Sequence, residues 1–264
     1  MSAQPAAHSH LEQAIDWRAP WWAPWRELGQ AVHARVLRGA AVHEALNAQG
    51  GAPVRFVPQA ALPHGLAYEA FIFETKSVPT RDDLHDFFNG LAWLRFGQIK
   101  ARLNALQYAQ IAQHGVQPLR GAVRDALTLF DENAAFLCSV RHAPVLAALR
   151  ERNWQAVFQT HRALLGRHPP ILFGHALLEK LVFPYKSITA HVFPAQAAMD
   201  FEAIAGSPGG LADLDAALSQ QLASQVWTPK PFVPLPVLGV PRWWAANEQA
   251  DFYTDRTVFR PLRS

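Results

Sequence analysis

The chain contains long segments in which apolar residues recur every three or four positions. One such segment covers residues 27–47 and ends before Gly50-Gly51, which predicts a helix there. Another follows Thr80, a candidate N-cap with Asp83 three positions later. We expect that helix to break near Gly97. Further helices are predicted at about residues 99–114, 144–165, 171–183 and 211–224.

Short apolar runs predict a small amount of strand. Residues 54–57 and 187–193 have the spacing of strands, and residues 67–74 fit a strand or a short stretch before the next helix. Two apolar runs, 126–130 and 134–140, flank the polar Asp131-Glu132-Asn133. That arrangement predicts a hairpin near residues 125–140.

Proline and tryptophan mark the two ends of the chain. The tail, residues 227–264, holds prolines among aromatic residues, so it should wrap across the domain as irregular chain. The Trp-rich segment 17–25 is expected to pack onto the core rather than to contact a membrane or a partner. With residues 1–10 as a loose terminus, the patterns predict a single, mostly helical α+β domain over 11–264 with a small sheet.

Composition is consistent with a large core. Hydrophobic residues make up 50% of the 264 residues and charged residues 17%, which argues against disorder. The net charge of +3 is too small to demand nucleic acid, although the basic balance allows an anionic small ligand. The single cysteine, Cys138, excludes an intrachain disulfide and is expected to be a buried small side chain.

Several classes of protein lack their signatures here. The sequence has no signal peptide and no run of ~18 apolar residues, so we expect a cytoplasmic protein without a membrane helix. Neither a phosphate loop, nor a dinucleotide-binding G-x-G-x-x-G after a strand, nor a G-x-S-x-G elbow occurs. The pattern indicates nothing about oligomeric state.

Six strings stand out in combination. They are TRDDLHDFFN (80–89), KARLN (100–104), DALTLFDEN (125–133), GHALLEK (174–180), PYKSITAH (184–191) and PVLGVP (236–241). Together they resemble a bacterial family defined only as a domain of unknown function, number 3025, over about residues 15–262. The resemblance implies one domain in a bacterial cytoplasm, and it implies no activity and no catalytic residue. The family often has Pro where this chain has Gly97.

The first candidate site residues lie at helical spacing. His85 and Asn89 are four positions apart and would share a helix face that Lys100 continues. His175 and Glu179 have the same spacing, so an imidazole and a carboxylate would lie side by side. Such a pair can ligate a metal, or the carboxylate can orient a general base.

Two further groups are candidates. Thr189 and His191 would point to one face of a strand, and with Lys186 just before them they could form an anion-binding corner. Asp131 and its polar neighbours are either turn residues or oxygen ligands for Mg²⁺.

These candidates lead to three competing interpretations. The first is an enzyme, such as a metal-assisted hydrolase acting on an anionic small molecule. The second is a non-catalytic protein that binds an anion, RNA or a protein through aromatics such as Trp243, Trp244 and Tyr253. The third is that the polar residues are architectural and supply hydrogen-bond partners to the tail. For the enzyme, the predicted catalytic residues are His85, Asp86, His175, Glu179 and His191, the substrate-binding residues Asn89, Lys100, Lys186 and Thr189, and the metal ligands His85, Asp86, His175 and Asp131.

Overall fold

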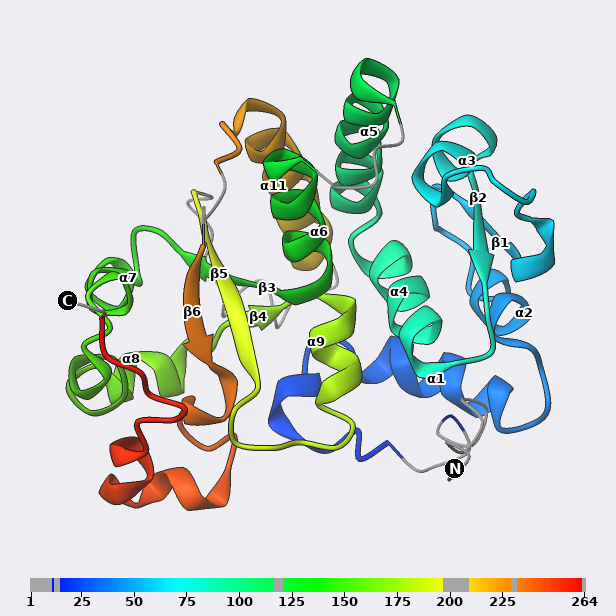
Figure 1. Cartoon of the computed structure of the whole chain (residues 1–264). Helices are drawn as coiled ribbons and strands as arrows, with labels where there is room; N and C mark the ends of the chain where they lie inside the picture. The colour runs from blue at the N-terminus through cyan, green and yellow to red at the C-terminus, as the bar shows by residue number, and fades with distance from the viewer. Residues whose placement is uncertain (1–10, 12–14, 116–120, 197–208, 229–231, 263–264) are drawn as a thin grey trace, which may run out of the picture.

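A four-stranded sheet lies at the centre of the molecule, with helices on both sides (Figure 1). The computed structural model describes residues 11, 15–115, 121–196, 209–228 and 232–262. The strand order is β4-β3-β5-β6. The pair β3–β5 is parallel, and the pairs β3–β4 and β5–β6 are antiparallel. The strands are β3 (Ala134–Cys138), β4 (Ile171–Leu172), β5 (Thr189–Ala195) and β6 (Val233–Pro236).

A second, two-stranded sheet lies apart from the first. It pairs β1 (Arg55–Pro58) in parallel with β2 (Ser77–Thr80). The connection between these strands contains helix α3, so this unit precedes the helices that lead to the central sheet (Figure 1). The helices are α1 (Arg26–Val36), α2 (Val42–Asn47), α3 (Tyr68–Thr75), α4 (Leu84–Arg95), α5 (Gly97–His114), α6 (Ala122–Asn133), α7 (Ala143–Arg150), α8 (Arg162–Arg167), α9 (His175–Lys180) and α11 (Gly210–Ser224). The helices and small sheets confirm the predicted α+β class.

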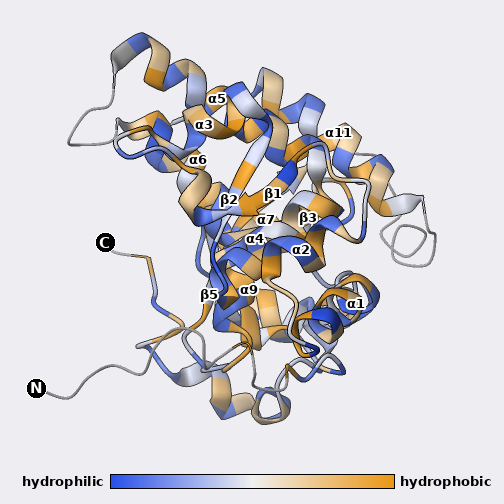
Figure 2. Ribbon diagram, turned by 90° about the vertical axis from the view of Figure 1, so that its right-hand side faces the viewer, coloured by the Kyte–Doolittle hydropathy of each residue, from blue (hydrophilic) through white to orange (hydrophobic). Residues whose placement is uncertain are grey.

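The core is continuous from the N-terminal tryptophans to the C-terminal tail. All five residues of β3 are buried, Cys138 among them, as expected for a central strand. Along most helices the ribbon alternates between hydrophilic and hydrophobic residues, as in amphipathic helices that cover a core (Figure 2). In the described part of the chain, no helix is both long and apolar enough to cross a bilayer.

The Trp-rich segment packs on this core, as predicted. Trp22 stacks on Phe88 of α4 with ring centroids 5.4 Å apart, and the Trp25 indole donates a hydrogen bond to the Leu172 carbonyl at 3.1 Å. Both tryptophans are fully buried. The segment therefore holds α4 and β4 against each other from outside the sheet.

The predicted hairpin near residues 125–140 is wrong. Residues 122–133 form helix α6, and β3 follows at once and pairs with the distant strands β4 and β5. Ala126, Leu127 and Phe130 are the buried face of that helix, so the apolar run has helical rather than strand periodicity. Asp131-Glu132-Asn133 is the last turn of the helix.

Other predicted boundaries also change. The helix expected over 27–47 is two helices, because Gly39 takes a left-handed backbone (φ +95°) between them. The N-cap of α4 is Asp83 rather than Thr80, which ends β2. The helix expected over 144–165 is divided into α7, a π-helical turn at Ala156–Thr160 and α8, and the one expected over 171–183 is β4 followed by the short α9. Residues 67–74 are helical. The predicted break near Gly97 is confirmed.

The Pro-rich tail lies on the body as expected. Its strand β6 is at the edge of the sheet, where prolines remove no internal ladder bond. The Asn247 amide donates to the carbonyls of Leu238 and Val240 and stabilises the irregular chain. Residues 1–10 lie outside the described residues.

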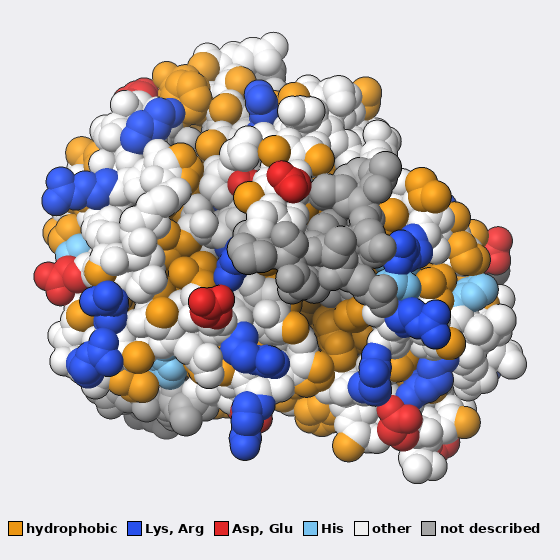
Figure 3. All heavy atoms as spheres, turned by 180° about the vertical axis from the view of Figure 1, so that it is seen from behind, with side chains coloured by type: hydrophobic (Ala, Val, Ile, Leu, Met, Phe, Trp, Pro, Cys, Tyr) orange, Lys and Arg blue, Asp and Glu red, His pale blue; other side chains and the backbone are white. Residues whose placement is uncertain are grey.

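The expectation of exposed tail aromatics is wrong. Trp243 is buried, and Trp244 and Tyr253 are half-buried. Trp243 packs on Trp21, and Tyr253 stacks on Phe158 of the body. On the face seen in Figure 3, the Lys and Arg side chains form separate groups with hydrophobic, acidic and neutral side chains between them. Neither feature favours a nucleic-acid surface.

Candidate acid–base site

A polar cavity of about 360 Å³ lies among α3, α4, α5, α6 and α9. Each of these helices contributes a polar side chain to its lining, and the segment before α4 adds Arg81. The residues that matter for its chemistry are Tyr68, His85, Asn89, Lys100, Asp131 and His175. Residues far apart in the sequence therefore converge at one place, as catalysis would require.

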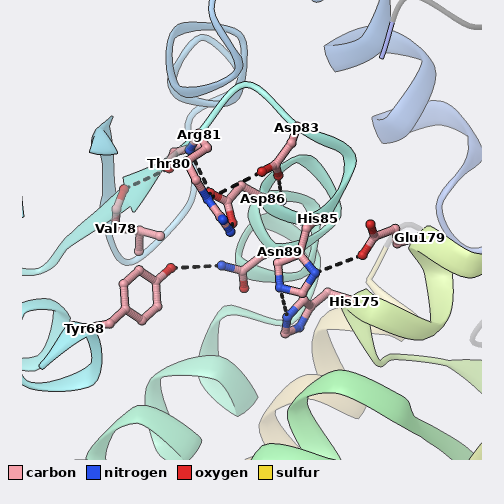
Figure 4. Close-up of polar contacts among 10 residues, drawn as sticks. All are labelled: Tyr68, Val78, Thr80, Arg81, Asp83, His85, Asp86, Asn89, His175 and Glu179. Carbon is pink, nitrogen blue, oxygen red and sulfur yellow. Dashed lines mark hydrogen bonds and ion pairs between the residues drawn. The ribbon is translucent and has the colours of Figure 1, made fainter. Parts of the chain in front are cut away.

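The start of α4 fixes His85 at this cavity. The Asp83 carboxylate accepts a hydrogen bond from the Asp86 backbone N–H at 2.8 Å and caps the helix. The Asp86 carboxylate in turn accepts bonds from the Arg81 backbone and from its guanidinium, at 2.7 to 3.0 Å (Figure 4). His85 lies between the two carboxylates in sequence, so its backbone position is set by both.

The start of α9 fixes His175. Gly174 precedes it, and a Cβ there would lie 2.3 Å from the Glu132 carbonyl oxygen and the Asn133 nitrogen. Only a glycine allows the start of α9 to approach the end of α6 this closely. The contact brings His175 Nδ1 to within 2.9 Å of the Asp131 carbonyl oxygen.

The two histidines contact each other through their Nε2 atoms, 3.2 Å apart, with the rings nearly perpendicular (Figure 4). The Asp131 carbonyl can only accept, so His175 Nδ1 carries a proton and its Nε2 presents a lone pair when the ring is neutral. His85 Nε2 must then donate. Because His85 Nδ1 also donates to the Glu179 carboxylate, at 2.9 Å, His85 is an imidazolium. The pair thus binds one shared proton.

The electrostatics agree with this assignment. The hydrogen bond to Glu179 raises the pKa of His85 above its usual value, although burial lowers it in part. Burial lowers the pKa of His175 to about 4, despite the nearby Asp131 carboxylate, which raises it. The two shifts have opposite signs and place the proton of the pair on His85, with His175 as the neutral acceptor.

A second chain of hydrogen bonds runs through Lys100. Two backbone N–H groups at the start of α5 donate to the Asp215 carboxylate, which places Lys100 in the first turns of that helix. The Lys100 ammonium donates to both oxygens of Asp131, at 2.6 and 2.8 Å, and to the Asn89 carbonyl oxygen at 2.8 Å. The Asn89 amide donates to the Tyr68 hydroxyl at 3.1 Å.

This chain keeps Asp131 charged. Burial raises the pKa of Asp131, but the Lys100 ammonium and nearby His175 lower it more, so the net shift is downward. Burial, with the Asp86 carboxylate nearby, raises the pKa of Tyr68 and keeps its hydroxyl protonated. Asp131 therefore joins the two chains, since its carbonyl orients His175 and its carboxylate holds Lys100.

The residues expected to bind a metal have other partners. Asp86 is paired with Arg81, and Asp131 with Lys100. Within the described ranges, no three His, Cys, Asp or Glu side chains are grouped so as to hold a metal ion. The expected set of His85, Asp86, His175 and Asp131 therefore does not form a ligand cluster.

Three other predicted residues lie away from the cavity. Lys186 forms an ion pair with Asp255 at 3.1 Å and lies over the Phe252 ring, and the Thr189 hydroxyl donates to the Ser187 carbonyl. His191 packs its ring near Phe232. The enzyme interpretation requires His191 to converge with His85 and His175, and this expectation is wrong, because β5 contributes no residue to the lining. The Lys186 ammonium of the predicted anion-binding corner is paired with Asp255.

Among the lining residues that sequence reasoning missed are Tyr68 and Arg81. Tyr68 is the first residue of α3, in a segment whose apolar run also fitted a strand. Arg81 stands in a loop, where hydrophobic spacing carries no information. The TRDDLHD string was the available signal for Arg81, but it did not identify Asp86 as its partner.

Comparison with known proteins gives a family and nothing more specific. The family model described as "Protein of unknown function (DUF3025)" matches residues 54–263. This chain belongs to DUF3025. The matched region contains every residue of the two hydrogen-bond chains, whereas the Trp-rich segment precedes it. No curated protein and no solved structure matches this member of DUF3025.

Proposed function

We propose that this chain is an enzyme that hydrolyses a small polar molecule bound in the central cavity, with His85 and His175 as a proton-transferring pair. One observation carries the proposal: two histidine Nε2 atoms lie 3.2 Å apart on a cavity wall while both Nδ1 atoms are held by acceptors. Such an arrangement stores one proton at a defined position. Histidine is the side chain best suited to move a proton near neutral pH.

The step can be written with its atoms balanced. The proton on His85 Nε2 passes to the leaving atom of the substrate as the scissile bond breaks. The oxygen of a water molecule bonds to the other fragment, and the proton of that water returns to the Nε2 pair. Glu179 stabilises the charged form of His85 through its Nδ1. His175 accepts the Nε2–H of His85 until that proton passes to the substrate.

The anionic substrate expected from the sequence receives little support from the charges. Arg81 and Lys100 each form an ion pair with a carboxylate of the same lining, and the protonated His85 is paired with Glu179. An anion would therefore compete with Asp86 or Asp131 for its partner. We propose that the substrate is not drawn in by net positive charge. The bacterial, cytoplasmic setting stays a prediction.

The test is ester hydrolysis with matched histidine variants. p-Nitrophenyl acetate and p-nitrophenyl phosphate serve as the neutral and anionic probes. We expect wild type to hydrolyse the acetate, and His85→Gln and His175→Gln each to lower the rate ~10²-fold or more, as for loss of a general acid–base group. The control is His161→Gln, because surface histidines also react with this ester and His161 lies outside the cavity.

Two outcomes contradict the proposal. Rates that are equal in wild type, His85→Gln and His175→Gln would show that the pair has no catalytic part. Loss of activity in His161→Gln to the same degree would assign the reaction to surface imidazoles. Circular dichroism on each variant checks that it remains folded.

A further inference from the structure

The directions of the hydrogen bonds leave the Tyr68 proton for a ligand. The Lys100 ammonium has no acceptor, so the Asn89 atom that it contacts must be the carbonyl oxygen. The other end of that amide, the NH₂ group, therefore donates to the Tyr68 hydroxyl. The hydroxyl accepts this bond, and its own hydrogen remains available to donate.

The cavity is the place where a ligand could accept that hydrogen. Tyr68 lines it, and among the described residues no hydrogen bond uses the Tyr68 proton. Figure 4 shows Asn89 between Tyr68 and the two histidines, so the Tyr68 hydroxyl and the Nε2 pair lie on the same side of the cavity. Tyr68 is half-buried, and a partly desolvated donor without an acceptor costs free energy unless a ligand or a water accepts its hydrogen bond.

The surrounding charges select the kind of acceptor. The lining contains three cationic side chains, Arg81, Lys100 and the protonated His85, against four carboxylates, those of Glu69, Asp86, Asp131 and Glu132. A further negative charge beside these carboxylates would be repelled. An uncharged oxygen, such as that of a carbonyl group, accepts the Tyr68 hydrogen bond without that repulsion.

We propose that Tyr68 is the substrate-positioning donor of the site and that the cavity takes an uncharged molecule through its carbonyl oxygen, an amide or an ester. This inference rests on the proposed function, because it names the substrate class of the same cavity. The apolar part of the molecule would lie against Leu62, Ile72 and Leu103, which share the lining. The Nε2 pair would then face the bond to be broken.

Three isosteric probes separate charge from shape. Benzamide, benzoate and benzamidinium share one ring and a planar head group, and all are small relative to about 360 Å³. Their dissociation constants are measured by protein-observed NMR titration in wild type and in Tyr68→Phe, which keeps the ring and removes the donor. The control is Tyr108→Phe, whose hydroxyl contacts Glu74 outside the cavity.

We expect benzamide to bind more tightly than benzoate in wild type. Tyr68→Phe should weaken benzamide about fivefold, the usual value of one neutral hydrogen bond, and should leave benzamidinium unchanged. Tyr108→Phe should change none of the three constants. The proposal is overturned if benzoate binds as tightly as benzamide, if Tyr68→Phe leaves benzamide binding unchanged, or if benzamide does not bind.

Failure of this inference differs from failure of the proposed function. The titration requires no turnover, so benzamide binding that depends on Tyr68 would stand even if no ester were hydrolysed. Conversely, a histidine-dependent hydrolysis with no effect of Tyr68→Phe on binding would keep the reaction and remove Tyr68 from it.

Discussion

Asp131 connects the two polar chains of the site at the level of single atoms. Its carbonyl oxygen accepts from His175 Nδ1, and its carboxylate accepts from Lys100. Since a carbonyl accepts only and an ammonium donates only, the direction of each following hydrogen bond is determined. One chain thereby holds a proton between the two imidazoles, and the other leaves the Tyr68 hydroxyl with a hydrogen to donate.

Stability should depend on pH through Glu179. The Glu179 hydrogen bond raises the pKa of His85 above its unfolded value of 6.5, so its contribution is complete below pH 6.5 and is lost as pH rises through the folded pKa. Glu179→Gln should therefore lower the free energy of unfolding near pH 6 and change it little at pH 9. The loss should stay below about 1 kcal/mol, because both side chains are about a third exposed (34% and 38%).

Urea unfolding of wild type and Glu179→Gln between pH 5.5 and 9 measures this gap. The exposed Glu151→Gln serves as the control, with no gap expected at any pH. If wild type and Glu179→Gln differ in unfolding free energy by the same amount at every pH, Glu179 does not raise the pKa of His85. His175 acts in the opposite sense: its pKa of about 4 means that its contribution is lost as pH falls from 6.5 towards 4.

The sequence identified most of these residues but not their partners. The four-residue spacing correctly placed His175 and Glu179 on one helix. Yet Glu179 binds His85 of α4 rather than His175, because α9 packs against α4 and their side chains meet across the interface. Spacing within one helix cannot reveal a contact between two helices, so Tyr68 remained hidden. The Arg81–Asp86 pair is local, but Arg81 precedes α4, where helical spacing does not apply.

At the level of elements, the close approach of α6 and α9 builds the site. Gly174 allows it, and the carbonyls at the end of α6 then lie beside the first turn of α9. The same polar triplet that ends α6 led to the mistaken hairpin, since Asp, Glu and Asn are common in helix ends and in turns alike. The long helices α5 and α11, which lie next to glycines, were predictable from the sequence alone.

Gly174→Ala should push α9 away from α6. A methyl group there meets backbone atoms at 2.3 Å, which cannot move as a side chain can. We expect a loss of ~1–3 kcal/mol of unfolding free energy and a displaced His175. Gly209→Ala is the matched control, because a methyl group at that position would have no heavy atom within 4 Å of it beyond its chain neighbours.

Thermal and urea unfolding of both variants, with the rate on p-nitrophenyl acetate, give the comparison. If Gly174→Ala is as stable and as active as Gly209→Ala, the close approach of α6 and α9 is not required for the site.

At the level of the whole molecule, the Trp-rich segment supports the site from behind. It precedes the region that the family model matches, yet Trp22 stacks on Phe88 of the helix that carries His85. The composition predicted this packing, because so many tryptophans interrupted by prolines suit neither a helix nor a membrane span. The order of the strands in the sheet was not predictable. β3 and β5 pair in parallel, and the segment between them contains helices whose boundaries the sequence pattern predicted wrongly.

Trp22→Ala should lower the unfolding free energy by ~3–5 kcal/mol, as for other large aromatic residues removed from a core. Trp22 is 1% exposed, whereas Tyr185 is 49% exposed, so the control substitution Tyr185→Ala should matter little. Urea denaturation measures both. An equal, small effect of the two substitutions would show that the segment is not part of the core.

The most direct test of the central claim is the protonation of His85 and His175, read from side-chain ¹⁵N chemical shifts by NMR in uniformly labelled protein at pH 7. His85→Gln and His175→Gln assign the two rings. We expect a charged His85 with both nitrogens protonated, and a neutral His175 with its proton on Nδ1 and an unprotonated Nε2 that accepts from His85. Two neutral rings, or a His175 protonated on Nε2, would contradict the shared proton and with it the proposed acid–base site.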